Sequence, residues 1–536
     1  MASSPLTQSL CSGPDDGLYQ DRTIYGTMQD RLADSADDYA LTEILADGSV
    51  GRRWTYRQLH DDAVKLGKAL AARHDRGAKF TVFAHNVPEW ILLELAGAYA
   101  GLILVTANPA LGANELRYIL EQSKSEAVYY TPLVRGSDLA KTAAEAAAGL
   151  ERVTTLIDMT DHDALFDGYD RGELRETKPD DPVQIQYTSG TTGFPKGALL
   201  HQKGLVQNGH DILSRDLVKK GYRLMHHMPM FHTSGCAILV LGSISMGCEL
   251  LLPPAFDPNM ICDVIEREKP EFSGCVPTML VALTEVAGTR DLSSIQSILC
   301  GGAMVSPELC RAAKDVFGCP VLIIYGQTEA SPGITGALPD DTEEDMTGTV
   351  GKPYPHMDVA ILDTGDQHII PIGEQGEIAV RGYNVMNGYN DNPEATAKAI
   401  TQDGWLLTGD LGRMDDRGYV RVTGRVKEMI IRGGENLFPA EIENAMLEHP
   451  GVAEVAVVGV PDPKWGELVA CFMRPASGEK PTPQDLKAHM RDRLSPQKTP
   501  AYWIWVDDWP LTGSGKIRKF ELSEQFQRGE HQAETA

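Results

Sequence analysis

Apolar residues alternate between helical and strand-like spacing over the first part of the chain. In 56–73 they recur three or four positions apart, which predicts a helix, and the run 80–83 predicts a strand. Helical spacing returns in 88–100, and a second series of the same kind occupies 204–325. Such alternation predicts mostly parallel sheets covered by helices, and these sheets bind ligands beyond the carboxyl ends of their strands.

The pattern changes twice further along. From about residue 348 to 424, short apolar runs are separated by Gly, Asp and Pro, which predicts a small β-rich subdomain. After Arg425 we expect a helix at 439–447, a strand at 455–460 and a helix at 483–494. A chain of 536 residues is also too long for one core. The sequence therefore predicts a large N-terminal domain, 1–425, and a small C-terminal domain, 426–536.

The net charge of the chain limits the kinds of molecule that it is expected to bind. A formal net charge of −26 argues against nucleic-acid binding and implies that any anionic substrate is attracted by a local group of cations. Nine dispersed cysteines without metal-ligand spacing predict reduced thiols. The apolar segment 90–105 is interrupted by Glu94 and Gly97, so we interpret it as core and expect no transmembrane segment. With no secretory signal at the N-terminus, a cytoplasmic protein is expected.

The most informative stretch is 187–197, Tyr-Thr-Ser-Gly-Thr-Thr-Gly-Phe-Pro-Lys-Gly. Its glycines permit close approach of backbone N–H groups to an anion, its hydroxyls add donors, and its lysine adds a positive charge. The spacing does not match a P-loop, because the first two glycines are too close and Pro195 precedes the lysine. We predict a phosphate-binding loop whose ligand groups are Thr188, Ser189, Gly190, Thr191, Thr192, Gly193 and Lys196.

Further motifs follow in a fixed order. They are Tyr325-Gly326-Gln327-Thr328-Glu329, Thr408-Gly409-Asp410, Gly424-Arg425-Val426-Lys427-Glu428, Gly433-Gly434-Glu435-Asn436 and Gly513-Ser514-Gly515-Lys516. With the phosphate loop, they resemble the adenylate-forming superfamily of acyl-CoA synthetases, firefly luciferase and peptide-synthetase adenylation domains. The resemblance covers about 54–520 and is greatest to a medium-chain fatty acyl-CoA ligase.

The resemblance implies an α/β fold. Two doubly wound α/β subdomains and a small β-barrel-like subdomain would form the N-terminal domain, followed by a mobile α+β C-terminal domain that rotates about Lys427. It also implies the reaction. ATP and a carboxylic acid would give an acyl-adenylate and pyrophosphate, and CoA would then displace AMP. ATP, Mg²⁺ and coenzyme A are the implied cofactors and co-substrates, and a homodimer is compatible with the family.

The resemblance assigns roles residue by residue. Lys516 matches the catalytic lysine, Glu329 the Mg²⁺ ligand with Thr192, and Thr328 the α-phosphate contact. Asp410 and Arg425 match the ribose-binding pair, and Tyr325 would stack on adenine. The remaining expected contacts with the nucleotide or with CoA are Gly301, Gly302, Ala303, Gly326, Gln327, Gly433, Gly434 and Glu435.

The acid is less well defined. His232 matches an acyl-site gating position, whereas His226 and His227 have no assigned role, and no set of zinc ligands is expected there. The expected pocket lacks an acidic partner for an amino group, so we predict an apolar acid, either medium-chain or cyclic and aromatic. Its lining is Met230, His232, Thr233, Ser234, Gly235, Val276, Pro277, Gly302, Ala303, Gly326 and Ser331. The alternatives are a ligase that loads an acyl carrier protein and a non-catalytic nucleotide-binding protein.

Overall fold

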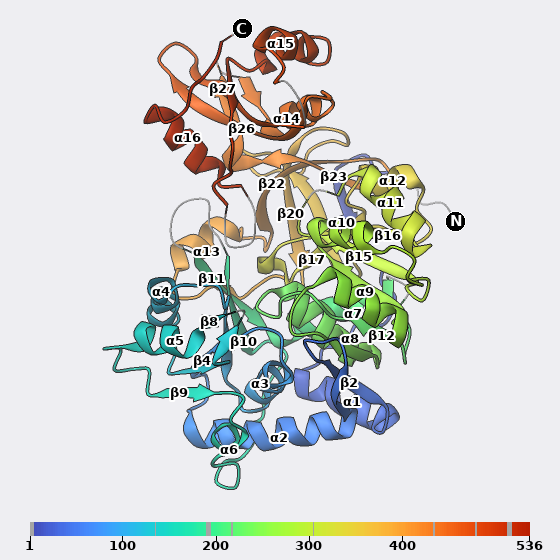
Figure 1. Cartoon of the computed structure of the whole chain (residues 1–536), viewed down its shortest axis with the longest axis vertical. Coiled ribbons are helices and arrows are strands. Elements are labelled where there is room, and N and C mark those ends of the chain that lie inside the picture. Colours follow the sequence, from blue (N-terminus) through green and yellow to red (C-terminus); the bar gives the residue numbers. More distant parts are fainter. Residues whose placement is uncertain are drawn as a thin grey trace.

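A computed structural model describes residues 5–134, 136–188, 195–215, 218–303, 305–432, 435–476, 480–511 and 517–535, apart from the side chains of Glu435 and Asn436. Two large sheets with helices form the lower part of the molecule in Figure 1, an antiparallel sheet lies above them, and the C-terminal elements lie at the top. This arrangement confirms the predicted α/β class with a small barrel-like subdomain.

The first sheet has seven strands in the order β21-β11-β10-β5-β4-β6-β9. Its β9, β6, β4, β5 and β10 strands are parallel, β11 pairs antiparallel with β10, and β21 pairs antiparallel with β11. The strands are β4 (Lys79–Phe83), β5 (Ile103–Ala107), β6 (Ala127–Tyr130), β9 (Thr155–Asp158), β10 (Pro182–Thr188), β11 (Lys196–His201) and β21 (Gly388–Tyr389). The helices along this part of the chain are α2 (Tyr56–Arg73), α3 (Pro88–Tyr99), α4 (Ala113–Ser123), α5 (Leu139–Ala147) and α6 (His162–Phe166), and β7 (Leu133–Val134) pairs with β8 (Ser137–Asp138).

The second sheet has nine strands in the order β18-β17-β16-β15-β14-β12-β13-β2-β3. Its six central strands are parallel, so their carboxyl ends meet at one edge. The strands are β2 (Tyr39–Ile44), β3 (Val50–Thr55), β12 (Arg223–Met225), β13 (Glu249–Leu252), β14 (Phe272–Cys275), β15 (Ser297–Gly301), β16 (Val321–Gly326), β17 (Gly333–Gly336) and β18 (Lys352–Pro353). The helices are α1 (Ile24–Ser35), α7 (Gln202–Arg215), the π-helix η1 (Ser234–Leu241), α8 (Gly242–Met246), α9 (Pro258–Glu268), α10 (Pro277–Val286), α11 (Pro307–Phe317), the 3₁₀ turn η2 (Thr328–Ala330) and α12 (Glu343–Gly348).

The third sheet is antiparallel and has the order β1-β19-β20-β22-β23. Its strands are β1 (Leu10–Ser12), β19 (Met357–Leu362), β20 (Gly376–Gly382), β22 (Leu406–Met414) and β23 (Val420–Arg425), with α13 (Pro393–Ala399) between β21 and β22. The edge strand β1 comes from the N-terminus and pairs with β19. Sequence periodicity did not predict it, because three residues are too few to show an alternation.

The C-terminal elements build a separate sheet with its own apolar clusters. The 3₁₀ turn η3 (Val426–Glu428) lies between β23 and this sheet. Lys519 pairs with Glu428 of that turn and with Glu443, at 2.8 Å to each. The elements are β24 (Ile430–Arg432), β25 (Glu435–Leu437), α14 (Pro439–Leu447), β26 (Val452–Asp462), β27 (Gly466–Pro475), α15 (Pro483–Arg491), η4 (Pro496–Lys498), β28 (Tyr502–Trp505) and α16 (Lys519–Gln527).

Local chemistry explains where the helices begin. The predicted bounds of α2 and α14 match the structure; Thr55 and Gln58 form a capping box at α2, and Pro439 occupies the first turn of α14. The helix α9 begins at Pro258, because Asp257 caps it by accepting from the Met260 N–H. The segment 90–105 is buried, as expected of core. No helix in the described part of the chain is long and apolar enough to cross a membrane.

A buried carboxyl group predicts a pH dependence of stability. Asp211 on α7 is fully buried and accepts from the Tyr383 hydroxyl and the Gln207 amide, both at 2.6 Å. Burial raises its pKa to about 7. Above pH ~4, the unfolded chain has lost this proton while the native state still holds it. The free energy of unfolding therefore falls as the pH rises from ~4 to about 7.

We expect Asp211→Asn to remove this pH dependence. Between pH 5 and pH 8, the unfolding free energy of the wild type should fall by about 3 kcal/mol relative to that of the variant. Urea unfolding of both proteins across this range, monitored by Trp fluorescence, measures the difference. Parallel curves for the two proteins would contradict the assignment.

Candidate active site

Four side chains converge where β10, β11 and η2 meet. Thr188 ends β10, Lys196 begins β11, and the two residues are paired across this hairpin. Glu329 of η2 is 9% exposed; its Oε1 accepts from the Tyr389 hydroxyl at 2.8 Å and from the Thr188 hydroxyl at 3.3 Å. The Lys196 ammonium lies 4.9 Å from the centre of the Tyr389 ring. One carboxylate, two hydroxyls and one ammonium thus form a site that can hold a metal-bound phosphate chain.

A second group lies at the end of β16. The Tyr325 hydroxyl donates to Asp410 Oδ2 at 2.9 Å, and Arg425 Nε lies 2.8 Å from Asp410 Oδ1. Asp410 on β22 is paired with Arg425 on β23, and only 6% of Asp410 is exposed. The structure therefore brings together three residues that the sequence places 85 and 15 positions apart. Burial raises the pKa of Tyr325 well above its ordinary value, with the Asp410 carboxylate as the next cause.

Lys427 is affected by the charge of one cation from each group. Burial lowers the pKa of Lys427, and the charges of Lys196 and Arg425 lower it further, so the three side chains share one region. Like charges are held together here although the whole chain carries a formal charge of −26. This is the local group of cations that an anionic substrate requires.

The expected acyl-site segment lies beside α3. The Asn86 side chain donates to the Met228 carbonyl at 2.9 Å and accepts from the Met230 N–H at 3.1 Å, which fixes the chain before His232. The His232 ring packs 4.4 Å from that of Phe231. Beyond it, Ser234 begins η1, and π-helices occur frequently at functional sites.

Glycine occupies the expected site positions for different physical reasons. A Cβ at Gly235 would lie 2.2 Å from the Pro229 carbonyl oxygen, and one at Gly326 would lie 2.0 Å from that of Pro332. Those two glycines are therefore required by backbone packing. Gly302 has φ +83° and would bring a Cβ to 3.6 Å from the Val276 side chain, so these two predicted lining residues are neighbours.

Other predicted residues vary in their placement. Thr328 is in η2 beside Glu329, and Gln327 donates its N–H to the Pro332 carbonyl. Ser331 is buried. Gly301 ends β15, where a Cβ would lie 2.5 Å from Ile324, and Pro277 starts α10 after Val276. Outside the described residues lie Ser189, Gly190, Thr191, Thr192, Gly193, Gly433, Gly434, Lys516 and the side chain of Glu435.

Sequence reasoning missed Tyr389 and Asn86. Tyr389 reaches Glu329 because β21 leaves the β-rich region and pairs with β11 of the first sheet. The motif Asn387-Gly388-Tyr389-Asn390, an aromatic residue amid turn residues, was the available signal. His227 was also incompletely described: its Nε2 lies 3.5 Å from Cys275 Sγ, and burial lowers its pKa to about 4.

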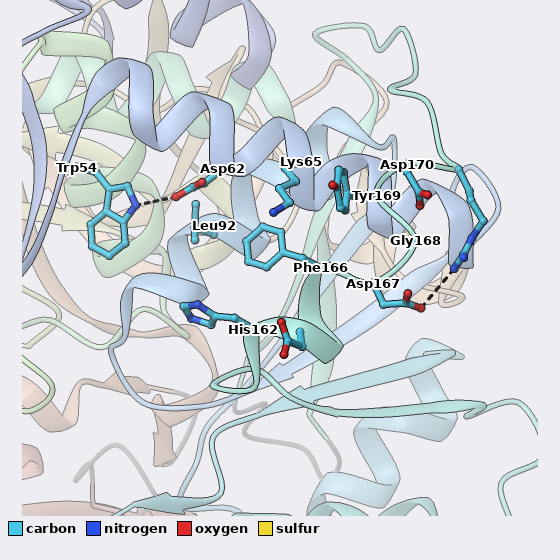
Figure 2. A pocket seen from close by; sticks show the side chains of 12 residues that line it. Trp54, Asp62, Lys65, Leu92, His162, Phe166, Asp167, Gly168, Tyr169 and Asp170 are labelled. Carbon is cyan, nitrogen blue, oxygen red and sulfur yellow. Dashed lines mark hydrogen bonds and ion pairs between the residues drawn. The ribbon is translucent and has the colours of Figure 1, made fainter.

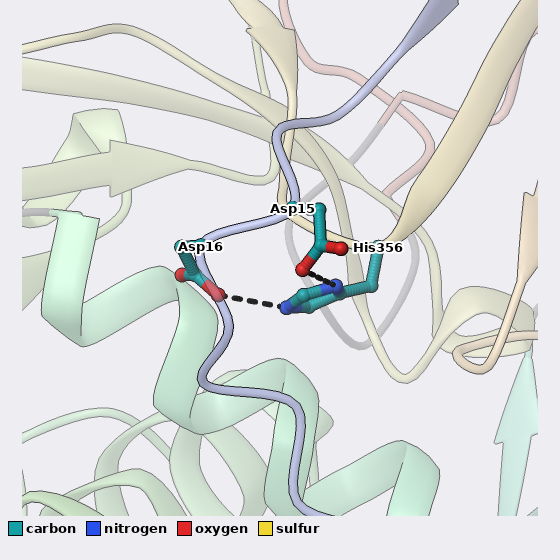
Figure 3. A group of neighbouring side chains, drawn as sticks. All are labelled: Asp15, Asp16 and His356. Carbon is teal, nitrogen blue, oxygen red and sulfur yellow. Dashed lines mark hydrogen bonds and ion pairs between the residues drawn. The ribbon is translucent and has the colours of Figure 1, made fainter.

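Two further clusters lie away from these groups. One is a cleft of about 550 Å³, in which Lys65 lies over the rings of Phe166 and Tyr169 (Figure 2). Figure 3 shows His356 between Asp15 and Asp16, with its Nε2 at 2.8 Å from the Asp16 carboxylate. Neither cluster includes a residue expected to bind ATP, CoA or the acid.

Known proteins share both the sequence and the fold. A family model described as AMP-binding enzyme matches residues 28–390, and one described as AMP-binding enzyme C-terminal domain matches 441–516. YngI of Bacillus subtilis is 35% identical over 94% of this chain and 97% of its own length. The human medium-chain acyl-CoA ligase ACSF2, a mitochondrial protein, is 34% identical over 89% of this chain and 83% of its own. ATP-bound MatB from Rhodopseudomonas palustris is 28% identical with a TM-score of 0.85, covering 95% and 99% of the two chains.

The chain therefore belongs to the AMP-binding enzyme family. It is an adenylate-forming enzyme of the group that contains the acyl-CoA synthetases. The same MatB without ligand gives a lower TM-score, 0.75, at the same 28% identity. The arrangement of this chain is thus closer to the ATP-bound form of MatB.

Proposed function

We propose that the enzyme activates an apolar carboxylic acid with ATP and transfers the acyl group to CoA, and that a medium-chain or cyclic acid is the substrate. The observation that carries the proposal is the Glu329 carboxylate, which accepts from Thr188 and Tyr389, with the Lys196 ammonium over the Tyr389 ring. The name of ACSF2 supports the medium-chain class. The nine free thiols favour a reducing compartment such as the cytoplasm.

In the first half-reaction, an oxygen of the substrate carboxylate attacks the α-phosphorus of ATP. The bond from that phosphorus to the bridging oxygen breaks, and pyrophosphate leaves. Two anions approach each other in this step, so fixed cations and donors stabilise the transition state. Thr188 and Lys196 would hold the outer phosphates and Asp410 the ribose hydroxyls. Glu329 would hold Mg²⁺, which neutralises phosphate charge when bound.

In the second half-reaction, the thiol of CoA loses its proton, and its sulfur attacks the acyl carbonyl carbon. The bond from that carbon to the phosphate oxygen breaks, and AMP leaves. Lys427 lies in η3, between the N-terminal sheets and the C-terminal sheet, where a few dihedral changes can rotate one part against the other. We assign the hinge to this residue, with 1–425 and 426–536 as the two domains.

A proline at the hinge should separate the half-reactions. Lys427→Pro fixes φ, so it should preserve acid-dependent pyrophosphate release and reduce thioester formation from supplied acyl-adenylate by about tenfold or more. Lys427→Ala is the matched control, because it removes the ammonium but leaves the backbone free. An equal loss for both variants in the second half-reaction would contradict the hinge.

A substrate panel tests the function itself. Acids of increasing length and ring type are supplied with ATP and Mg²⁺, with and without CoA, and pyrophosphate, AMP and thioester are measured. We expect an apolar acid to give all three products when CoA is present. AMP without thioester would instead favour transfer to an acyl carrier protein, and no nucleotide turnover with any acid would favour a binding protein.

A further inference from the structure

An unpaired carboxyl group lies in the core of the first subdomain. Glu94 in α3 is 3% exposed, and neither of its carboxyl oxygens has a hydrogen-bond partner among the described residues. One turn earlier on the same helix, Trp90 Nε1 also lacks a partner within that part of the chain. Nearly all buried polar groups are hydrogen-bonded, so this combination requires an explanation.

The cluster extends to β10 and η1. Gln186 Nε2 donates to Cys236 Sγ at 3.1 Å, whereas Gln186 Oε1 is buried and unpaired with respect to the described residues. After burial, Glu94 is the next group that raises the pKa of the Cys236 thiol, which indicates that its carboxyl lies near that sulfur. Glu94, Trp90, Gln186 and Cys236 therefore form one polar cluster, which we call the α3 cluster.

The residues of the α3 cluster lie close in sequence to residues of both halves of the candidate site. Gln186 precedes Thr188 by two residues on β10, so its side chain is on the same face of that strand as the phosphate-site threonine. Cys236 directly follows Gly235 in the expected acyl-site segment. Asn86, at the start of the same α3 region, fixes Met228 and Met230. An acyl chain that enters past His232 would thus extend toward these residues.

The unpaired donors and acceptors of the α3 cluster match a neutral ligand. Burial raises the pKa of Glu94 well above its ordinary value, which favours the neutral form of its carboxyl. The cluster then offers the Trp90 N–H and the Glu94 O–H as donors, with the Glu94 carbonyl and Gln186 Oε1 as acceptors. A hydroxyl group both donates and accepts, so it can satisfy both kinds. A carboxylate would place a second acid beside Glu94, and a methyl group would leave every atom unpaired.

We propose that the α3 cluster is the far end of the acyl site and binds a hydroxyl group near the tail of the substrate acid. This inference rests on the proposed function. It changes the preferred substrate from a plain alkyl acid to one that is apolar along its chain and hydroxylated near its end. A site that hydrogen-bonds a substrate hydroxyl discriminates strongly against the analogue that lacks it, because its own buried groups are then left unpaired.

The test compares matched acids on matched variants. Hexanoate, octanoate and decanoate are each paired with the acid hydroxylated at the terminal or penultimate carbon, and kcat/KM for pyrophosphate release is measured. For at least one length, the wild type should favour the hydroxy acid by about tenfold or more. Glu94→Leu should remove this preference, whereas Glu94→Gln, which keeps the shape and the hydrogen bonds, should retain most of it. Trp90→Phe, a milder change that deletes one donor, should reduce the preference even if Glu94→Leu fails to fold.

Two results would overturn the proposal. One is a wild-type preference for the plain acid at every length. The other is an unchanged ratio in Glu94→Leu and Trp90→Phe, as expected if bound water satisfies the cluster. If no acid of either kind releases pyrophosphate, the proposed function fails, and the two failures are thereby distinguished.

Discussion

Lys516→Ala is expected to abolish acid-dependent pyrophosphate release and to leave transfer from supplied acyl-adenylate to CoA near the wild-type level. The lysine is assigned by its family motif, and it would neutralise charge on the carboxylate and the α-phosphate as they approach. Loss of one such contact reduces kcat by about 10²- to 10³-fold, or about 3 to 4 kcal/mol. Single-turnover assays of the two half-reactions measure the two effects separately.

Two variants control for loss of charge alone. Lys141→Ala removes an ammonium that is 71% exposed on α5 and pairs with Glu145, so both half-reactions should continue unchanged. Lys516→Arg keeps the positive charge and should recover part of the adenylation rate. An equal loss of both half-reactions in Lys516→Ala would refute the assignment of this lysine to the first step alone.

Glu329→Gln is expected to have an effect of similar size on adenylation. The substitution keeps the shape of the side chain but removes the negative charge that would hold Mg²⁺, so acid-dependent pyrophosphate release should fall by about 10²- to 10³-fold. The concentration of Mg²⁺ that gives half the maximal rate should rise in the variant. A magnesium titration at saturating ATP and acid measures both quantities.

Tyr389→Phe is the matched control for Glu329. It deletes one hydrogen bond to the carboxylate and leaves its charge, so the rate should fall by only about tenfold, the equivalent of ~1.4 kcal/mol. An unchanged magnesium requirement in Glu329→Gln would exclude the carboxylate as a metal ligand. A larger loss in Tyr389→Phe than in Glu329→Gln would instead assign the main role to the tyrosine hydroxyl.

Local sequence predicted the elements that have strong local signals. The helices α2 and α14 carry periodicity and N-terminal signals, and the strand β4 is an apolar run, so their bounds follow closely from the residues. The strand β1 could not be predicted, because its pairing with β19 joins residues about 350 positions apart. Pairing of this kind is a property of the tertiary fold.

In the candidate site, too, some features could be predicted from the sequence and others could not. Asp410 and Arg425 were expected as a pair from their motifs, and the structure joins them across β22 and β23. The packing requirement at Gly235 and Gly326 could not be predicted, because a glycine in the sequence does not reveal that a carbonyl lies where a Cβ would be. Glu94 was noted only as an interruption of an apolar segment. Its isolation inside the core is visible only when α3, β10 and η1 are packed together.

The most direct test of acid activation by ATP and transfer to CoA is pyrophosphate release from ATP and Mg²⁺ across the acid panel, followed by addition of CoA. We expect that one class of apolar acid drives pyrophosphate release, and that addition of CoA then yields the CoA thioester of that acid and AMP in equal amounts. ATP that stays intact with every acid, in protein shown to be folded, would contradict it.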